Sequence, residues 1–96
     1  MRRNRLEIII DILEAAKEGI NKTGIVYKTN LNFWITNKYL ALLIEKGFLE
    51  KKGEEYATTD NGKVFLGKAR EIVSQLSDNI DQQGTSGVTR WFSWFL

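Results

Sequence analysis

The chain has 96 residues, of which 43% are hydrophobic and 27% are charged, and its formal net charge is +2. This size suits one small hydrophobic core and excludes two. Cysteine and histidine are absent, which excludes disulfides, thiol nucleophiles, the commonest metal ligand and the usual general base near neutral pH, so we expect no metal site. The sequence also has no Gly-rich phosphate loop and no nucleophile–base pair, so we expect no enzyme and no cofactor.

The charge is distributed unevenly along the chain. Residues 1–53 contain 10 basic and 6 acidic side chains, whereas residues 54–96 contain 4 and 6, so the two parts carry +4 and −2. This asymmetry suits a basic face joined to a more acidic assembly element. The basic start is not followed by an uninterrupted apolar segment with a cleavage site, so we expect no signal peptide and a cytoplasmic protein.

The first predicted helix begins at Asn4, because Glu7 three residues later completes a capping box. Its apolar residues follow the spacing of a half-buried helix, namely Leu6, Ile9, Ile10, Leu13, Ala16 and Ile20. Gly19 is expected to end this helix, and residues 20–22 are expected to add a very short strand to a later hairpin. A second, short helix follows, with Thr23 as its predicted cap.

The third predicted helix covers residues 33–46 and follows a tight turn at residues 30–32. Asn32 is expected to cap it, Leu31 to point into the core, and Gly47 to end the helix. Its predicted inner face comprises Phe33, Thr36, Leu40, Leu43 and Ile44. Its predicted outer face comprises Trp34, Ile35, Asn37, Lys38 and Ala41.

After this helix the hydrophobic period changes from strand-like to helix-like. Residues 48–52 and 56–58 are predicted to form a β-hairpin around a turn at residues 53–55. Asp60 is then placed to cap a long helix that starts at Asn61. Helices, a short hairpin and a further helix in this order are typical of a winged helix. The predicted fold class is therefore α+β, mainly α: a winged helix-turn-helix with a short wing.

The long helix is predicted to continue beyond the domain, with apolar residues at alternating spacings of four and three. A helix that projects from a small domain needs a partner for its apolar face, so we predict a homodimer through a coiled coil. The predicted interface residues are Phe65, Ala69, Ile72, Val73, Leu76 and Ile80, and Asn79 is expected to help fix the register. Three segments result: 1–66 as the winged-helix domain, 61–83 as the dimerisation helix, and 84–96 as a linker with an aromatic tail.

The tail contains Trp91, Phe92, Trp94 and Phe95, and such a segment rarely stays solvated. It is too short to span a bilayer, which requires roughly 20 apolar residues in a helix. We expect it to fold back onto the long helix or onto a second subunit. An interfacial membrane anchor and a docking peptide for another protein are the alternatives.

Four segments of the chain resemble a known family. Residues 8–19, 22–31 and 39–47, followed by the motif YATTDNG at residues 56–62, are similar to the small archaeal winged-helix DNA-binding proteins. The resemblance covers about residues 4–80. It implies a homodimer that binds double-stranded DNA as a transcriptional regulator or chromatin-associated protein, with the long helix paired antiparallel to its copy.

In a helix-turn-helix the second helix of the pair enters the major groove and exposes side chains near its N-terminus to base edges. The candidates for these contacts are Asn32, Trp34, Ile35, Asn37 and Lys38. Asn37 can pair with an adenine, and Lys38 can contact a guanine or a phosphate. Ile35 or Trp34 can contact a thymine methyl group.

Phosphate contacts are expected from a larger set of basic residues. They are Lys22, Lys28, Lys51, Lys52 and Lys63, with Arg2, Arg3 and Arg5 at the start of the chain. Glu54 and Glu55 at the wing tip repel phosphate, so we expect the wing to contribute less than the third helix.

Each of these assignments has a structural alternative. Asn37 and Lys38 can belong to an ordinary solvated face, and Trp34 can pack against the first helix or the wing. The whole protein can also be a winged-helix module for protein–protein interaction, with membrane contact through its tail. Trp34 and Ile35 favour this alternative, because they place apolar groups on the outer face.

Overall fold

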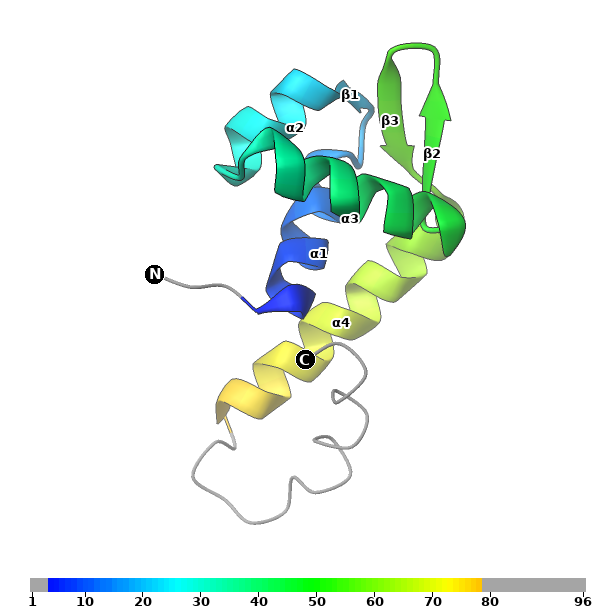
Figure 1. The fold of residues 1–96 in the computed structure, drawn as a ribbon. Helices are drawn as coiled ribbons and strands as arrows, with labels where there is room; N and C mark the ends of the chain where they lie inside the picture. The colour runs from blue at the N-terminus through cyan, green and yellow to red at the C-terminus, as the bar shows by residue number, and fades with distance from the viewer. Residues whose placement is uncertain (1–3, 79–96) are drawn as a thin grey trace.

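Seven elements follow one another in residues 4–78, the part of the chain that the computed structural model describes. They are α1 (Arg5–Ala15), β1 (Ile20–Asn21), α2 (Lys22–Thr29), α3 (Phe33–Glu45), β2 (Leu49–Lys52), β3 (Glu55–Thr58) and α4 (Asp60–Asp78) (Figure 1). This order confirms the predicted winged-helix architecture. None of the helices in this stretch combines the length and hydropathy that crossing a bilayer requires.

α1 begins with the predicted capping box. Asn4 Oδ1 accepts a hydrogen bond from Glu7 N at 2.8 Å, and Glu7 Oε1 accepts one from Asn4 N at 3.1 Å. The buried face of the helix comprises Leu6, Ile9, Ile12 and Leu13. The chain then turns through Gly19, whose φ of 92° favours glycine.

α2 is capped by Asn21, so the prediction of Thr23 as the cap was wrong. Asn21 Oδ1 accepts a hydrogen bond from Gly24 N at 2.7 Å. Asn21 also pairs with Glu55 in the sheet, and this pairing holds its backbone in the extended conformation that a cap residue requires. The short strand β1 therefore determines where α2 begins.

α3 follows a turn at Asn30, which has a φ of 58°, and Asn32 caps it as predicted. Thr36, Leu40 and Leu43 form its buried stripe. Phe33 and Ile44 were predicted to lie inside, but they are 51% and 41% exposed. Both residues lie at one edge of the buried stripe, so this part of the prediction was wrong.

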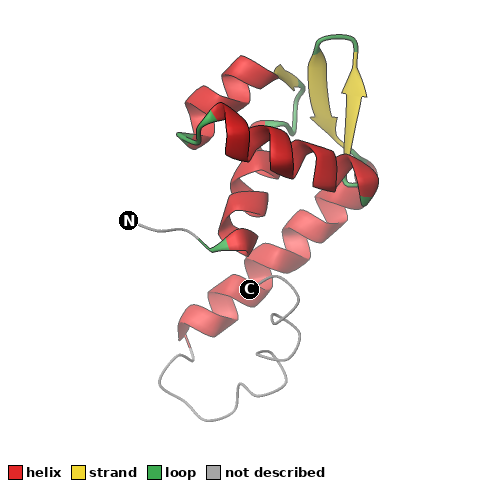
Figure 2. Ribbon diagram, in the orientation of Figure 1, coloured by secondary structure: helices red, strands yellow, loops and turns green. Residues whose placement is uncertain are grey.

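The three strands form an antiparallel sheet in the order β1-β3-β2. Leu49 pairs with Thr58 and Lys52 with Glu55, which confirms the predicted hairpin. The turn is one residue shorter than predicted, because Glu55 already belongs to β3. The hairpin projects from the helices as the wing (Figure 2).

α4 is capped by Thr59, so the prediction of Asp60 as the cap was wrong by one residue. Thr59 Oγ1 accepts a hydrogen bond from Gly62 N at 3.0 Å, and the carbonyl oxygen of Thr59 accepts one from Lys63 N at 2.8 Å. Thr59 Oγ1 also donates to Gly47 O at 2.7 Å. The same residue therefore starts α4 and binds the end of α3.

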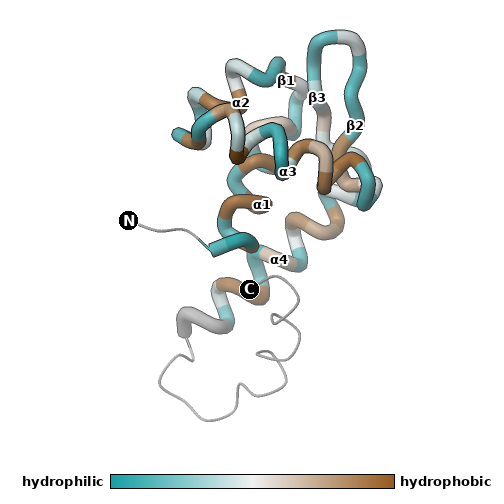
Figure 3. The backbone as a smooth tube through the Cα atoms, in the orientation of Figure 1, coloured by the Kyte–Doolittle hydropathy of each residue, from teal (hydrophilic) through white to brown (hydrophobic). Residues whose placement is uncertain are grey.

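The first half of α4 packs on the domain, mainly against α1. Leu66 and Ala69 are buried, while Ile72 and Val73 are partly buried against the same core. The Phe65 ring stacks on Phe48, with centroids 4.5 Å apart. Apolar stretches of α1 and α3 lie close together at the centre of the domain (Figure 3). Phe65 and Ala69, which were predicted as dimer-interface residues, therefore pack on their own domain.

Several predictions concern residues outside the described range. They are the phosphate contacts of Arg2 and Arg3, the register residue Asn79, the dimer residue Ile80, and the linker and tail at residues 84–96.

Candidate nucleic-acid interface

α3 is held at both ends by hydrogen bonds. At its start, Asn32 Oδ1 accepts from Ile35 N at 2.7 Å. At its end, Phe48 N donates to Leu43 O at 3.0 Å, and Gly47 O accepts from Thr59 Oγ1. The helix is therefore fixed between the α2 turn and the wing, and its outer face is presented as one surface.

Trp34, Asn37 and Lys38 lie on that outer face, as predicted from the helical spacing. Trp34 is 71% exposed, which contradicts the alternative in which it packs against α1 or the wing. Lys38 Nζ lies 5.3 Å from the centre of the Trp34 ring. At an exposed site such a cation–π contact contributes about 0.5–1 kcal/mol, so it favours one orientation of the indole.

Asn32 and Ile35 are less available for contacts with bases than the other candidates at α3. The side-chain oxygen of Asn32 is already used in the helix cap, and Ile35 is partly buried. Reassigning the Asn32 oxygen to a base would cost about 1 kcal/mol of capping energy. The outer face therefore depends mainly on Trp34, Asn37 and Lys38.

The two lysines predicted to contact phosphate from the wing, Lys51 and Lys52, lie on opposite faces of it, because successive side chains of a strand point to opposite faces. Lys51 lies on the same face as Tyr56, with Nζ 5.8 Å from the centre of that ring. Lys52 lies on the other face, where its Nζ is 3.5 Å from Glu50 Oε2. The two lysines therefore cannot contact the same stretch of phosphates from one face.

Lys52 shares a polar hollow of about 560 Å³ with the start of α4. The charged residues that line it are Lys17, Lys52, Lys63, Glu18, Glu50 and Asp60. The three positive and three negative charges cancel, so the hollow has no net charge. Lys63 was predicted to contact phosphate, and the structure places it in this neutral environment.

The two predicted lysines of α2 lie at opposite ends of that helix. Lys28 is exposed in the last turn, next to the turn that leads into α3. Lys22 is partly buried at the first position of α2, beside β1. Only Lys28 is therefore close to the N-terminal end of α3.

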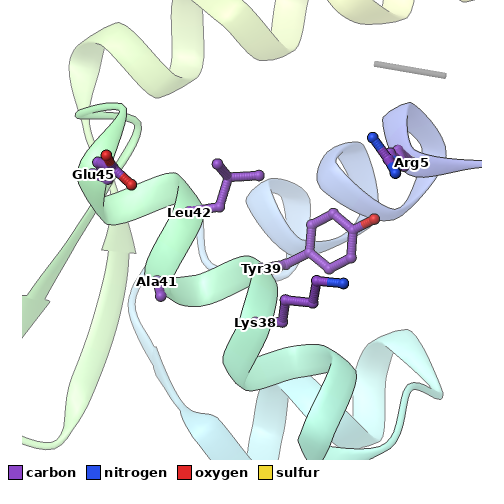
Figure 4. A pocket seen from close by; sticks show the side chains of 6 residues that line it. All are labelled: Arg5, Lys38, Tyr39, Ala41, Leu42 and Glu45. Atoms are coloured by element: carbon purple, nitrogen blue, oxygen red, sulfur yellow. The ribbon is translucent and has the colours of Figure 1, made fainter. Parts of the chain in front are cut away.

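Arg5 was predicted to contact phosphate together with Arg2 and Arg3 at the start of the chain. It is the first residue of α1 and lines a groove of about 410 Å³ with α3 residues. Figure 4 shows Tyr39 and Lys38 extending from α3 toward the side of α1 that carries Arg5. Because the capping box starts α1 at Arg5, this position follows from a feature visible in the sequence.

Two further aromatic residues near the α2–α3 turn were not among the predicted site residues. Tyr27 on α2 is 87% exposed, and Phe33 is the first residue of α3. Tyr27 precedes the exposed Lys28 in a helix with little apolar character, and this is the signal that identifies it as a surface residue.

Comparison with known proteins identifies a family and relatives of this chain. A family model described as winged helix-turn-helix matches residues 2–77. The uncharacterized protein MJ0287 of Methanocaldococcus jannaschii is 36% identical over 72 residues, which cover 74% of each chain. MJ0290 of the same organism is also uncharacterized and is 32% identical over 73 residues, which are 75% of this chain but 35% of that longer protein.

A solved structure shares the fold over almost the whole chain. It is the crystal structure of Sso10a-2, described as a DNA-binding protein from Sulfolobus solfataricus. The TM-score is 0.72 at 24% sequence identity, and the match covers 93% of this chain and 96% of that one. At this identity the likeness establishes a common fold.

Proposed function

Because this chain belongs to the winged helix-turn-helix family, we propose that it binds double-stranded DNA with α3 in the major groove. The observation that carries the proposal is the outer face of α3, where Trp34, Asn37 and Lys38 are exposed on a helix held at both ends. The DNA-binding description of Sso10a-2, which has the same fold, supports it. A DNA partner implies a location inside the cell.

Phosphate contacts in this proposal come from four of the predicted basic residues. They are Lys38 on α3, Arg5, which lines a groove with α3 residues, Lys28 before the α2–α3 turn, and Lys51 on the wing. Lys22, Lys52 and Lys63 contribute less, because Lys22 is partly buried and the other two have acidic neighbours. Four phosphate contacts predict a slope of about −3.6 for log affinity against log salt per subunit.

We further propose that the protein acts as a homodimer through α4, with each subunit contacting one half-site. Ala69 is only 2% exposed in its own chain, so the interface depends on the outer edge of Phe65, on Ile72 and Val73, and on Leu76 and Ile80. An antiparallel pair of α4 helices would set the spacing of the half-sites. Such a dimer suits a transcriptional regulator or a chromatin-associated protein.

The test of DNA binding is the affinity of the purified chain for a mixed-sequence duplex at several salt concentrations. Binding should weaken steeply with salt and should be lost in the double variant Lys28→Glu and Lys38→Glu. Lys68→Glu is the matched control, because it reverses an exposed charge on α4, away from α3. Absence of binding at low salt would overturn the proposal.

A protein–protein interaction module is the second candidate function. Its support is the exposure of three aromatic side chains, Tyr27, Phe33 and Trp34, around the α2–α3 turn, since aromatic residues are enriched in protein interfaces. In that case Trp34→Ala would abolish binding to a protein partner, and the reversal of Lys28 and Lys38 would have little effect.

A further inference from the structure

The outer face of α3 offers only a few chemical groups to the edges of base pairs. Its sequence contains no arginine, the residue that most often specifies guanine by a bidentate contact. Near the N-terminus of the helix the exposed groups are one indole, one amide and one ammonium, from Trp34, Asn37 and Lys38. The identity of the preferred base pair follows from what each of these groups can recognise.

Asn37 is the amide on this face that is free of a structural role. The other asparagine near the helix start, Asn32, has its side-chain oxygen in the α3 cap. An exposed asparagine amide donates and accepts at once, which matches N6 and N7 of adenine in the major groove. Guanine presents two acceptors there, so the same amide satisfies it only in part.

Trp34 supplies an apolar surface three residues before Asn37, on the same face of the helix. Side chains at this spacing are about 5–6 Å apart at Cβ, which lies between one and two base-pair steps of about 3.4 Å. The C5-methyl of thymine is the apolar group that the major groove displays. The ammonium group of Lys38 lies over the indole ring. Lys38 is exposed, so this ammonium is also available to a phosphate.

Resting on the proposed DNA binding, we propose that α3 recognises A·T base pairs through the major groove. Asn37 contacts adenine N6 and N7, and Trp34 contacts a thymine methyl in the same or the adjacent pair. Lys38 is a positioning residue for the indole. The target class is therefore A·T-rich duplex DNA, recognised by its major-groove groups and not by its narrow minor groove.

The experiment compares the affinity of the full chain for three duplexes of equal length, with alternating A·T, A·U or I·C pairs. Uracil lacks only the methyl group of thymine. The I·C pair has the minor-groove groups of A·T, but in the major groove it carries the N7 and O6 acceptors of guanine and, like A·U, lacks the methyl group. We expect A·U to bind about fourfold more weakly than A·T per subunit, the value of one buried methyl group. We expect I·C to bind at least about fivefold more weakly than A·U, for loss of the adenine contact.

Two variants assign these differences to their residues. Trp34→Ala should abolish the preference for A·T over A·U and retain the preference for A·U over I·C, whereas Asn37→Ala should lose most of the preference for A·U over I·C. Tyr27→Ala removes another exposed aromatic side chain, from α2, and should change neither ratio. Because the ratios are compared between variants, differences in duplex shape cancel.

Several outcomes would overturn the inference while leaving DNA binding intact. Equal affinity for A·T and A·U would exclude the methyl contact, and equal affinity for A·T and I·C would indicate minor-groove or shape recognition. A Trp34→Ala variant that weakens all three duplexes equally would make the indole a general contact. If no duplex, including a mixed sequence, binds at low salt, the proposed function itself fails and the inference fails with it.

Discussion

Arg70 Nη1 on α4 lies 2.6 Å from Glu14 Oε2 on α1. The pair bridges the two helices on the surface of the domain, beside the buried contact of Ala69 with the core. It therefore adds an electrostatic constraint to the direction in which α4 leaves the domain.

This ion pair is expected to make a small, salt-dependent contribution. Its side chains are 60% and 32% exposed, and pairs of this kind typically contribute about 0.2–1 kcal/mol. A double-mutant cycle with Arg70→Met and Glu14→Gln, measured by urea denaturation, should give a coupling energy in that range that falls with added salt. Lys68→Met is the control, and a coupling of zero at low salt would contradict the prediction.

Thr59→Ala should destabilise the fold by about 1–3 kcal/mol. The variant loses the cap of α4, which typically costs about 1 kcal/mol, and also the hydrogen bond to Gly47 O. Asp60→Ala is the matched comparison. It removes only a favourable charge in the first turn, which contributes about 0.3–1 kcal/mol. Urea denaturation should rank Thr59→Ala as the more damaging change, and the reverse order would restore Asp60 as the cap.

Gly62→Ala and Gly67→Ala should change stability in opposite directions, although both lie in α4. A Cβ at Gly62 would clash with the carbonyl oxygen of Phe48, whereas nothing lies within 4 Å of one at Gly67. We expect Gly62→Ala to cost at least about 1–3 kcal/mol. Gly67→Ala should stabilise by about 0.5–1 kcal/mol, because alanine is the better helix former. Thermal denaturation of both variants tests this pair.

Thr36→Val should stabilise the domain. The Thr36 hydroxyl is buried and has no hydrogen-bond partner among the described residues, and an unsatisfied buried group costs about 1–3 kcal/mol. Thr29→Val is the control, because the buried hydroxyl of Thr29 donates to Ile25 O at 2.7 Å, so its loss should destabilise. If Thr36→Val is the more damaging of the two in urea denaturation, the Thr36 hydroxyl has a partner.

Glutamate at Ile72 and Leu76 should convert the proposed homodimer into monomers. Two charges in an apolar interface would have to be desolvated on association, which strongly disfavours the dimer. Light scattering gives the molar mass, and Ser74→Glu is the control at an exposed position of the same helix. Because Ile72 also packs on its own domain, circular dichroism must show that the variant is folded. A dimer mass in the folded double variant would exclude this interface.

The periodicity of the sequence was sufficient to predict the helices and the hairpin, but not the residues at which they begin. Asn21 and Thr59 were missed as caps in favour of Thr23 and Asp60, which are similar chemically. The choice between neighbouring polar residues depends on which one has an extended backbone. At Asn21 that conformation is imposed by pairing with β3, a long-range contact that local sequence does not contain.

The candidate site was predictable where it depends on a single helix. Spacing alone placed Trp34, Asn37 and Lys38 outside and Leu40 inside. The position of the basic residues depends on how elements are packed, and this explains why Lys52 and Lys63 were grouped with Lys51 although the structure places them elsewhere. The alternation of side chains along β2 could have separated Lys51 from Lys52.

Thr59 has a wider consequence than its capping role. Its hydroxyl bonds both to Gly47, just beyond the end of α3, and to Gly62 in the first turn of α4, so one side chain links the helix proposed to enter the groove with the helix proposed to hold two subunits together. In the proposed dimer, a change in the crossing angle of the two α4 helices would rotate the two α3 surfaces that we propose to face DNA. The geometry of the dimer would thereby decide which pairs of half-sites both subunits can reach at once.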